Sequence, residues 1–130
     1  MIRRRIVVTG IGAITPIGLD IPQFWEGLIS GRNGVTPIEY FDASRFDTQF
    51  AAQASGFNPE EYFDKKSVKR LDKFSQFAIA SSVQAISDSE INLEKINRER
   101  FGVVYGSGIG GLETLQNEHW KYFQDKNPGM

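Results

Sequence analysis

Two clusters of glycines are the residues whose type and spacing could do chemistry, and each follows a short apolar run. Gly10 and Gly12 come directly after residues 6–8, and four glycines between 106 and 111 come after residues 101–105. Glycines at a turn between a strand and a helix let backbone amides approach a phosphate, as in dinucleotide-binding proteins. The same freedom also permits a tight turn and close packing without any ligand. The two loops therefore pose a choice between a nucleotide site and a structural turn.

The spacing of the glycines disfavours a nucleotide site. A Gly-x-Gly-x-x-Gly match from Gly10 would need a third glycine where Thr15 stands, and Pro16 follows it. The version found in short-chain dehydrogenases would need glycines in place of Ile14 and Pro16. The second loop lacks the Gly-Lys-Ser/Thr sequence of a phosphate-binding P-loop. We therefore favour structural turns over an NAD(P)-dependent reductase, and we expect no cofactor.

Residue types that are absent exclude several kinds of site from these 130 residues. The chain has no cysteine and a single histidine, His119. Disulfides, thiolate metal sites, a cysteine nucleophile and a two-histidine centre are excluded, so we predict no metal site in this chain. Because 15 basic and 16 acidic residues give a net charge of −1, no general positive field points to nucleic acid. His119 belongs to the apolar stripe of a predicted helix, so we assign it a structural role.

The elements that must position the two loops alternate between apolar strands and helices. Asp20 and Gly31 are a good N-cap and a good stop for an amphipathic helix, and Gln23 is placed for a capping-box contact. The stretch 77–86 is apolar or small almost all round, which is typical of a buried helix. The sequence predicts strands over 5–10, 49–55 and 101–105, an irregular connection over 32–48, and helices over 20–31, 58–61, 66–88, 92–98 and from 112 to a stop at 127–129. This alternation predicts an α/β layer fold with a mostly parallel sheet.

The start of the chain superficially resembles a signal peptide, because three arginines precede an apolar run. Gly10, Gly12 and Pro16 interrupt that run before it reaches the length of a signal-peptide core. No stretch approaches the apolar length that a bilayer span requires. The expectation is a cytoplasmic protein without a membrane partner.

Five stretches of the chain resemble elongating β-ketoacyl-[acyl-carrier-protein] synthases of the second type in order and in spacing. They are Val7-Val8-Thr9-Gly10-Ile11-Gly12 continuing through Thr15-Pro16-Ile17-Gly18, then Trp25-x-x-Leu28-x-x-Gly31-x-x-Gly34, Phe41-Asp42-x-Ser44, Lys69-Arg70-Leu71-Asp72-Lys73-Phe74, and Phe101-Gly102-Val103-Val104-Tyr105-Gly106-Ser107-Gly108-Ile109-Gly110-Gly111. Each stretch alone is a weak signal, but together they run in register over nearly the whole chain. The chain therefore resembles the N-terminal part of such a synthase, and 1–130 is expected to be an incomplete piece of its domain.

The resemblance implies a thiolase-like layered fold of two similar halves, with only the N-terminal part of the first half present. Members of the family are usually homodimers. They hold an acyl group as a thioester on a cysteine and join it to malonyl-[acyl-carrier-protein] by decarboxylative Claisen condensation in fatty-acid biosynthesis. The cysteine and two assisting histidines belong to later segments of the family sequence, so this stretch alone is expected to be inactive. The alternative is a ketosynthase-like or chain-length partner domain of a polyketide pathway. The segment that follows would distinguish the two, because a chain-length partner lacks the nucleophilic cysteine.

The resemblance also carries two sites onto this chain. The isoleucine inside the family's glycine turn borders the acyl-chain pocket, which places Ile109 there with Gly108 at the turn; the alternative is that Ile109 fills core. A basic segment that receives the acidic acyl carrier protein matches four residues at helical spacing, which gives a compact positive patch. These residues are Lys65, Lys66, Lys69 and Arg70. The alternative for them is a solvated helix end beside Asp64 and Asp72.

Overall fold

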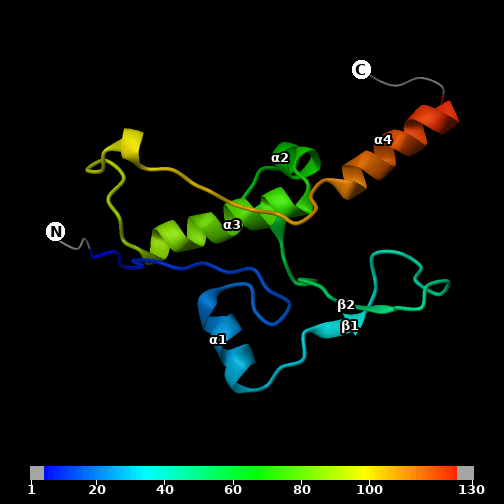
Figure 1. Ribbon diagram of the computed structural model, residues 1–130, viewed down its shortest axis with the longest axis horizontal. Coiled ribbons are helices and arrows are strands. Elements are labelled where there is room, and N and C mark those ends of the chain that lie inside the picture. The colour runs from blue at the N-terminus through cyan, green and yellow to red at the C-terminus, as the bar shows by residue number, and fades with distance from the viewer. Residues whose placement is uncertain (1–4, 126–130) are drawn as a thin grey trace.

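The computed structural model describes residues 5–125, and helix α3 lies at the centre of an open arrangement (Figure 1). In chain order the elements are α1 (Ile21–Ile29), β1 (Val35–Pro37), β2 (Phe50–Ala52), the 3₁₀ turn η1 (Pro59–Glu61), α2 (Lys65–Arg70), α3 (Lys73–Asp88), the 3₁₀ turn η2 (Arg98–Arg100) and α4 (Leu112–Asp125). In the view of Figure 1, α1 and the small sheet lie on one side of α3, and α2 and η2 lie on the other. None of the helices in this described stretch combines the length and the apolar character that a membrane crossing needs.

Helix α1 forms where its capping residues predict it. The Asp20 carboxylate accepts hydrogen bonds from the backbone N–H of Gln23 and from its side-chain amide, both at 2.8 Å. Gly31 follows the last turn with a φ of 64°, a left-handed conformation that glycine adopts without strain. The helix predicted over 20–31 is confirmed, although the Gln23 side-chain oxygen accepts from the N–H of Leu19 (3.3 Å) and not from that of Asp20.

The single helix predicted over 66–88 is wrong, because the chain breaks between α2 and α3. Leu71 has an extended backbone with φ −100° and ψ 125°, and it ends α2. The buried side-chain amide of Gln76 donates to the carbonyl groups of Val68 (3.1 Å) and Leu71 (2.8 Å), which α2 leaves free. Since a buried amide is costly without partners, this contact stabilises the break and joins the two helices.

Helix α3 is the element on which the first glycine loop lies. A β-carbon at Gly10 would collide with the carbonyl group of Ala85, and one at Gly12 with that of Ser81. The backbone N–H of Ala13 donates to the Gln84 side-chain oxygen at 3.0 Å, which fixes the loop along the helix. The small side chains of α3 therefore let another segment approach closely, and the glycines serve that approach.

The sheet content of the described residues differs from the prediction. Strands β1 and β2 pair antiparallel, with Val35 opposite Ala52 and Pro37 opposite Phe50. Strand β2 confirms the prediction over 49–55, whereas β1 lies where an irregular connection was predicted. Three residues ending in a proline are too few to show the alternation of a strand, which explains the miss.

The strands predicted over 5–10 and 101–105 are not formed in the described chain. Both segments are extended coil in Figure 1 and have no ladder partner there. A strand needs a neighbouring backbone for its hydrogen bonds, and a helix such as α3 has already used its own. As a result Ile6 is 95% exposed and Val104 is 100% exposed.

Asparagine residues begin the short turns of the chain. The helix predicted over 92–98 is wrong, because residues 93–95 form only a turn, where the N–H of Glu94 donates to Asn92 (2.9 Å), and η2 begins at Arg98. The turn predicted over 58–61 is confirmed as η1, capped by Asn58.

The last helix is also where the sequence predicts it. Helix α4 begins at Leu112, directly after the left-handed residue Gly111. Its predicted stop at 127–129 lies outside the described residues.

Little of the chain is buried within itself. Among the described residues only Gly18, Gly27, Ala43, Gln76 and Ala80 are buried, and no large side chain is fully enclosed. The chain exposes 11304 Å² of surface, whereas a compact monomer of its mass exposes about 6,900 Å². The excess includes apolar side chains from every part of the chain, so these faces are available for covering by further protein.

We expect the 130 residues, produced alone, to oligomerise or precipitate, because their apolar faces and unpaired edges have no internal partner. Size-exclusion chromatography with light scattering, alongside binding of a hydrophobic dye, checks this expectation. A sharp, reversible unfolding transition of a monomer would contradict it.

Candidate functional site

The glycine turn, defined as residues 106–111, lies against the first turn of α3 directly before α4 (Figure 1). Gly111 has a left-handed φ of 71°. A β-carbon at Gly110 would lie 2.9 Å from the Phe74 ring, so the backbone rests directly on that ring. Gly108 sits in a bend with open space around it. The contacts of the turn therefore require Gly110 and Gly111, whereas the sequence had singled out Gly108.

Ile109 is presented at the surface by this turn. Its side chain is 75% exposed, so it does not fill core in this structure. It lines a shallow hollow together with Phe74 and Leu112. The result is an apolar side chain on a glycine-flanked bend, available to a further apolar group.

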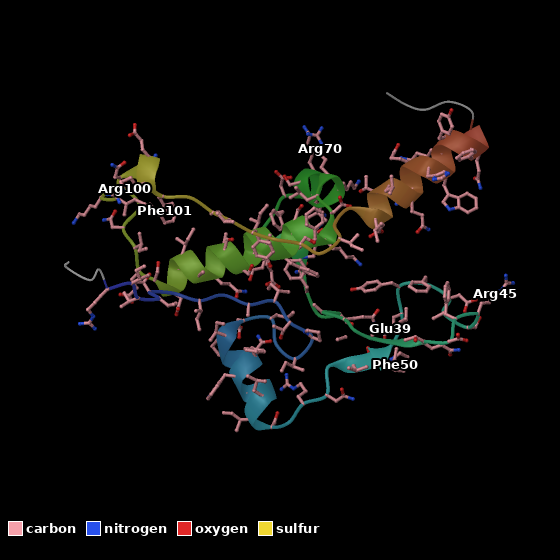
Figure 2. The ribbon with its side chains drawn as sticks, viewed as in Figure 1. Glu39, Arg45, Phe50, Arg70, Arg100 and Phe101 are labelled. Carbon is pink, nitrogen blue, oxygen red and sulfur yellow. The ribbon has the colours of Figure 1, made fainter. Side chains whose placement is uncertain are left out.

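Helix α2 carries four exposed basic side chains, called here the basic cluster. The cluster consists of Lys65, Lys66, Lys69 and Arg70. Figure 2 shows Arg70 pointing away from the rest of the molecule. Among the described residues the single ion pair joins Lys121 to Glu118 (2.6 Å), so no carboxylate there neutralises the cluster. Lys69 and Arg70 also lie in the last turn of α2, where the helix dipole favours positive charge.

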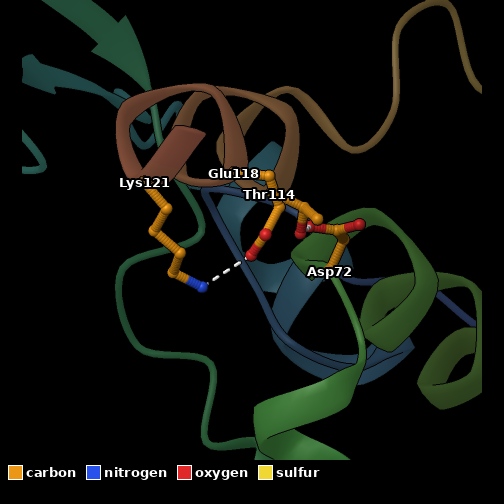
Figure 3. A network of polar contacts seen from close by, with 4 residues as sticks. All are labelled: Asp72, Thr114, Glu118 and Lys121. Carbon is orange, nitrogen blue, oxygen red and sulfur yellow. Dashed lines mark hydrogen bonds and ion pairs between the residues drawn. The ribbon is translucent and has the colours of Figure 1, made fainter. Parts of the chain in front are cut away.

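The two carboxylates nearest in sequence to the basic cluster are engaged in other contacts. Asp64 caps α2 by accepting from the backbone N–H of Ser67 at 2.7 Å. That backbone hydrogen bond, helped by the Ser67 side chain, holds the pKa of the Asp64 carboxyl below its ordinary value of 3.8. Asp72 accepts from the Thr114 hydroxyl at 2.6 Å (Figure 3). Neither carboxylate compensates the cluster through an ion pair.

The two predicted sites are neighbours in space. One hollow is lined by Lys69, Arg70 and Asp72, and the hollow beside Ile109 is lined by Asp72 and Lys73 as well. The stretch 69–74 therefore joins the basic cluster to the glycine turn. The sequence had treated these features separately.

Two polar residues of the region, Thr114 and Gln84, were missed at the sequence level. The Gln84 amide donates to the carbonyl group of Leu19 (2.7 Å) and to the Tyr62 hydroxyl (2.9 Å), and so holds the first loop and η1 on α3. A glutamine inside the otherwise apolar stretch 77–86 was the available signal, because such a side chain needs partners. Thr114 gave no comparable signal, since its partner is 42 residues away.

The first glycine loop and His119 pack against neighbouring parts of the chain. Gly10 and Gly12 of the first loop lie against carbonyl groups in the second half of α3. The His119 ring lies 4.5 Å from the Phe123 ring within α4, in keeping with the predicted helix stripe. Among the residues that the structure describes, no group of three metal-binding side chains comes together.

Comparison with known proteins decides the family. The sequence model of the family described as "Beta-ketoacyl synthase, N-terminal domain" matches residues 3–129. The chain belongs to the β-ketoacyl synthase family. This β-ketoacyl synthase chain is 42% identical over 126 residues to the 3-oxoacyl-[acyl-carrier-protein] synthase 2 of Synechocystis sp., covering 97% of this chain and 30% of that protein.

Other relatives of this β-ketoacyl synthase chain carry the same name. The 3-oxoacyl-[acyl-carrier-protein] synthase 2 of Vibrio cholerae is 42% identical over 119 residues, which cover 92% of this chain and 29% of that protein. The one of Staphylococcus aureus is 38% identical over 125 residues, which cover 96% and 30% respectively. The chain thus spans about 30% of the length of these curated relatives.

Solved ketosynthases share the backbone arrangement of this chain. "The ishigamide ketosynthase/chain length factor" superimposes with a TM-score of 0.85 at 25% identity, covering 97% of this chain and 31% of that one. A β-ketoacyl synthase from Burkholderia phymatum superimposes with a TM-score of 0.74 at 24% identity, covering 98% and 31%. These likenesses support the predicted thiolase-like fold, although the predicted parallel sheet is not formed within the described residues, whose only sheet is β1–β2.

Asp64 makes helix α2, and with it the basic cluster, sensitive to pH. Because its folded pKa is lowered, the stabilisation of α2 is complete above the ordinary pKa of 3.8 and is lost as the pH falls through the lower folded value. Asparagine caps helices without a charge, so Asp64→Asn should keep α2 and abolish this titration. The amide resonance of Ser67, followed by nuclear magnetic resonance in acid, measures it. An equal titration in both proteins would contradict the assignment.

Proposed function

We propose that this chain is the N-terminal part of a condensing enzyme of fatty-acid biosynthesis, an acyltransferase acting on malonyl-[acyl-carrier-protein]. The observation that carries the proposal is the family match over residues 3–129, together with relatives named 3-oxoacyl-[acyl-carrier-protein] synthase 2. In such a condensation, loss of carbon dioxide from the malonyl group leaves a carbanion at its α-carbon. That carbon attacks the carbonyl of an enzyme-bound acyl thioester, and the cysteine thiolate leaves as the new carbon–carbon bond forms.

The reacting groups would come from outside these 130 residues. The chain contains no cysteine, and its one histidine lies in the stripe of α4. The described residues would therefore contribute a scaffold, a wall of the acyl pocket and a docking surface. By itself the chain would be inactive.

The glycine turn would form part of the acyl pocket, with Ile109 against the acyl chain and Gly108 at the bend. The apolar side chain of Ile109 is exposed on this turn, and covering it with a fatty chain would remove apolar surface from water. The open space around Gly108 would let the bend adjust to the chain.

Residues 1–130 would form an incomplete domain. The exposed apolar segments at 6–8 and 103–104 are suited to become strands once neighbouring strands pair with them. The exposed face of α4 is suited to burial by further helices, or by the second subunit of a homodimer.

The basic cluster would receive the acyl carrier protein. Its four cations are exposed and form no ion pair within the described residues, so their field reaches into solvent and speeds encounter with an acidic partner. The stretch 69–74 places the cluster next to the glycine turn. A carrier protein bound there would deliver its acyl group beside Ile109, and this reaction would take place in the cytoplasm.

A ketosynthase-like or chain-length partner domain of a polyketide pathway is the second candidate. The similarity to the solved ketosynthase/chain length factor favours it. The full chain distinguishes the two candidates, since a synthase needs a cysteine nucleophile followed by two histidines and a chain-length partner lacks the cysteine.

Reversing the charge of the basic cluster tests the docking role. In the full-length protein we expect K69E/R70E to lower kcat/KM for carrier-protein substrates about tenfold at low salt, and less at high salt. Activity on acyl groups carried by free pantetheine should not change.

A matched control reverses two arginines of η2, R98E/R100E, which lie near the opposite end of α3 (Figure 2). Equal losses in both double variants would contradict docking at the basic cluster. Full-length protein without any condensing activity would contradict the proposed function itself.

A further inference from the structure

Asp72 occupies the capping position of α3 but does not cap it. The residue precedes α3 with an extended backbone, φ −61° and ψ 154°, and its side chain makes no capping hydrogen bond. Instead its Oδ1 accepts from the Thr114 hydroxyl at 2.6 Å, across 42 residues of sequence (Figure 3). Aspartate is among the preferred capping residues, so a carboxylate used in this other way has a different structural task.

The glycine turn is held between the two ends of this hydrogen bond. On one side, Gly110 rests on the Phe74 ring, and a β-carbon at Gly111 would lie 3.3 Å from Oδ2 of Asp72. On the other side, the carbonyl group of Gly111 accepts from the N–H of Leu115 (2.9 Å), and this is the first hydrogen bond of helix α4. The hydrogen bond between Asp72 and Thr114 therefore ties the first turn of α3 to the first turn of α4.

The position of Ile109 follows from this link. Its side chain lines the same hollow as Asp72 and Phe74, and it lies one residue before the glycine that rests on Phe74. On its other side, Gly108 has open space where a β-carbon would stand, and Ser107 before it lines a hollow with Phe74. The turn is thus tied by a hydrogen bond on the side of Asp72, whereas the bend at Gly108 has room around it.

We propose that Asp72 and Thr114 are positioning residues, whose hydrogen bond fixes the supported end of the glycine turn and so sets where Ile109 stands in the acyl pocket. The part of this inference that concerns the acyl pocket rests on the proposed function, whereas the hydrogen bond itself is observed. A hydrogen-bonded anchor after Ile109 and open space around Gly108 before it would let Ile109 respond to acyl chains of different length without releasing the turn.

Thr114→Val removes the hydroxyl without changing the shape of the side chain, and Thr114→Ser keeps the hydroxyl. In the full-length protein, hydrogen exchange by mass spectrometry reads the mobility of residues 106–113. The ratio of kcat/KM for myristoyl to that for hexanoyl substrates measures the chain-length preference of the acyl pocket. We expect Thr114→Val to speed exchange and to change the ratio roughly threefold to tenfold, the range of one typical solvent-exposed hydrogen bond. Thr114→Ser should restore both readouts, and Asp72→Ala should reproduce Thr114→Val.

The control is Glu118→Gln, which weakens the ion pair with Lys121 one turn further along α4 and should leave both readouts unchanged (Figure 3). Unchanged exchange in Thr114→Val would overturn the anchoring role. Faster exchange with an unchanged ratio would overturn the link to Ile109. An unmodified protein with no condensing activity, but with exchange that responds to Thr114→Val, would overturn the proposed function and leave the anchor standing.

Discussion

The close approach of other backbone segments to helix α3 is the constraint on which the rest of the structure depends. Gly10 and Gly12 let the first loop lie against the carbonyl groups of Ala85 and Ser81. Gly110 lets the second loop rest on the ring of Phe74. Because atoms of α3 fill the space next to these three glycines, a larger residue there would push the loops away from the helix. Glycines of both clusters thus serve the same purpose, which is to let a loop pack closely on one end of α3.

This packing brings the candidate functional groups together. The break between α2 and α3 turns the basic cluster outward, while the first turn of α3 supports the glycine turn. The basic cluster and the glycine turn therefore share the stretch 69–74, so a partner bound to the cluster would also contact residues that support the turn. The buried amide of Gln76 keeps that stretch in shape by binding the free carbonyl groups of α2.

The sequence predicts those features whose causes lie within a few residues. Helices α1 and α4 and the turn η1 follow from capping residues and apolar spacing, and the thiolase-like family follows from five motifs in register. The break at 71–72 and the Asp72–Thr114 bond depend on contacts between distant residues, which no local pattern reveals. The segments at 5–10 and 101–105 have strand-like sequences, but a strand exists only beside another strand. The roles of Ile109 and of the basic cluster stay predictions, since exposure and charge are compatible with them and do not prove them.

The central claim, that glycines allow the first loop to lie on α3, is tested most directly by Gly12→Ala in the full-length protein. The added β-carbon would meet the carbonyl group of Ser81, so we predict a loss of about 1–3 kcal/mol in unfolding free energy, seen as a lower melting temperature. The matched change Gly56→Ala, at an exposed glycine whose added β-carbon would meet only the end of the Leu19 side chain at 3.3 Å, should be close to neutral. A Gly12→Ala protein that melts at the same temperature as the unmodified protein would contradict the account.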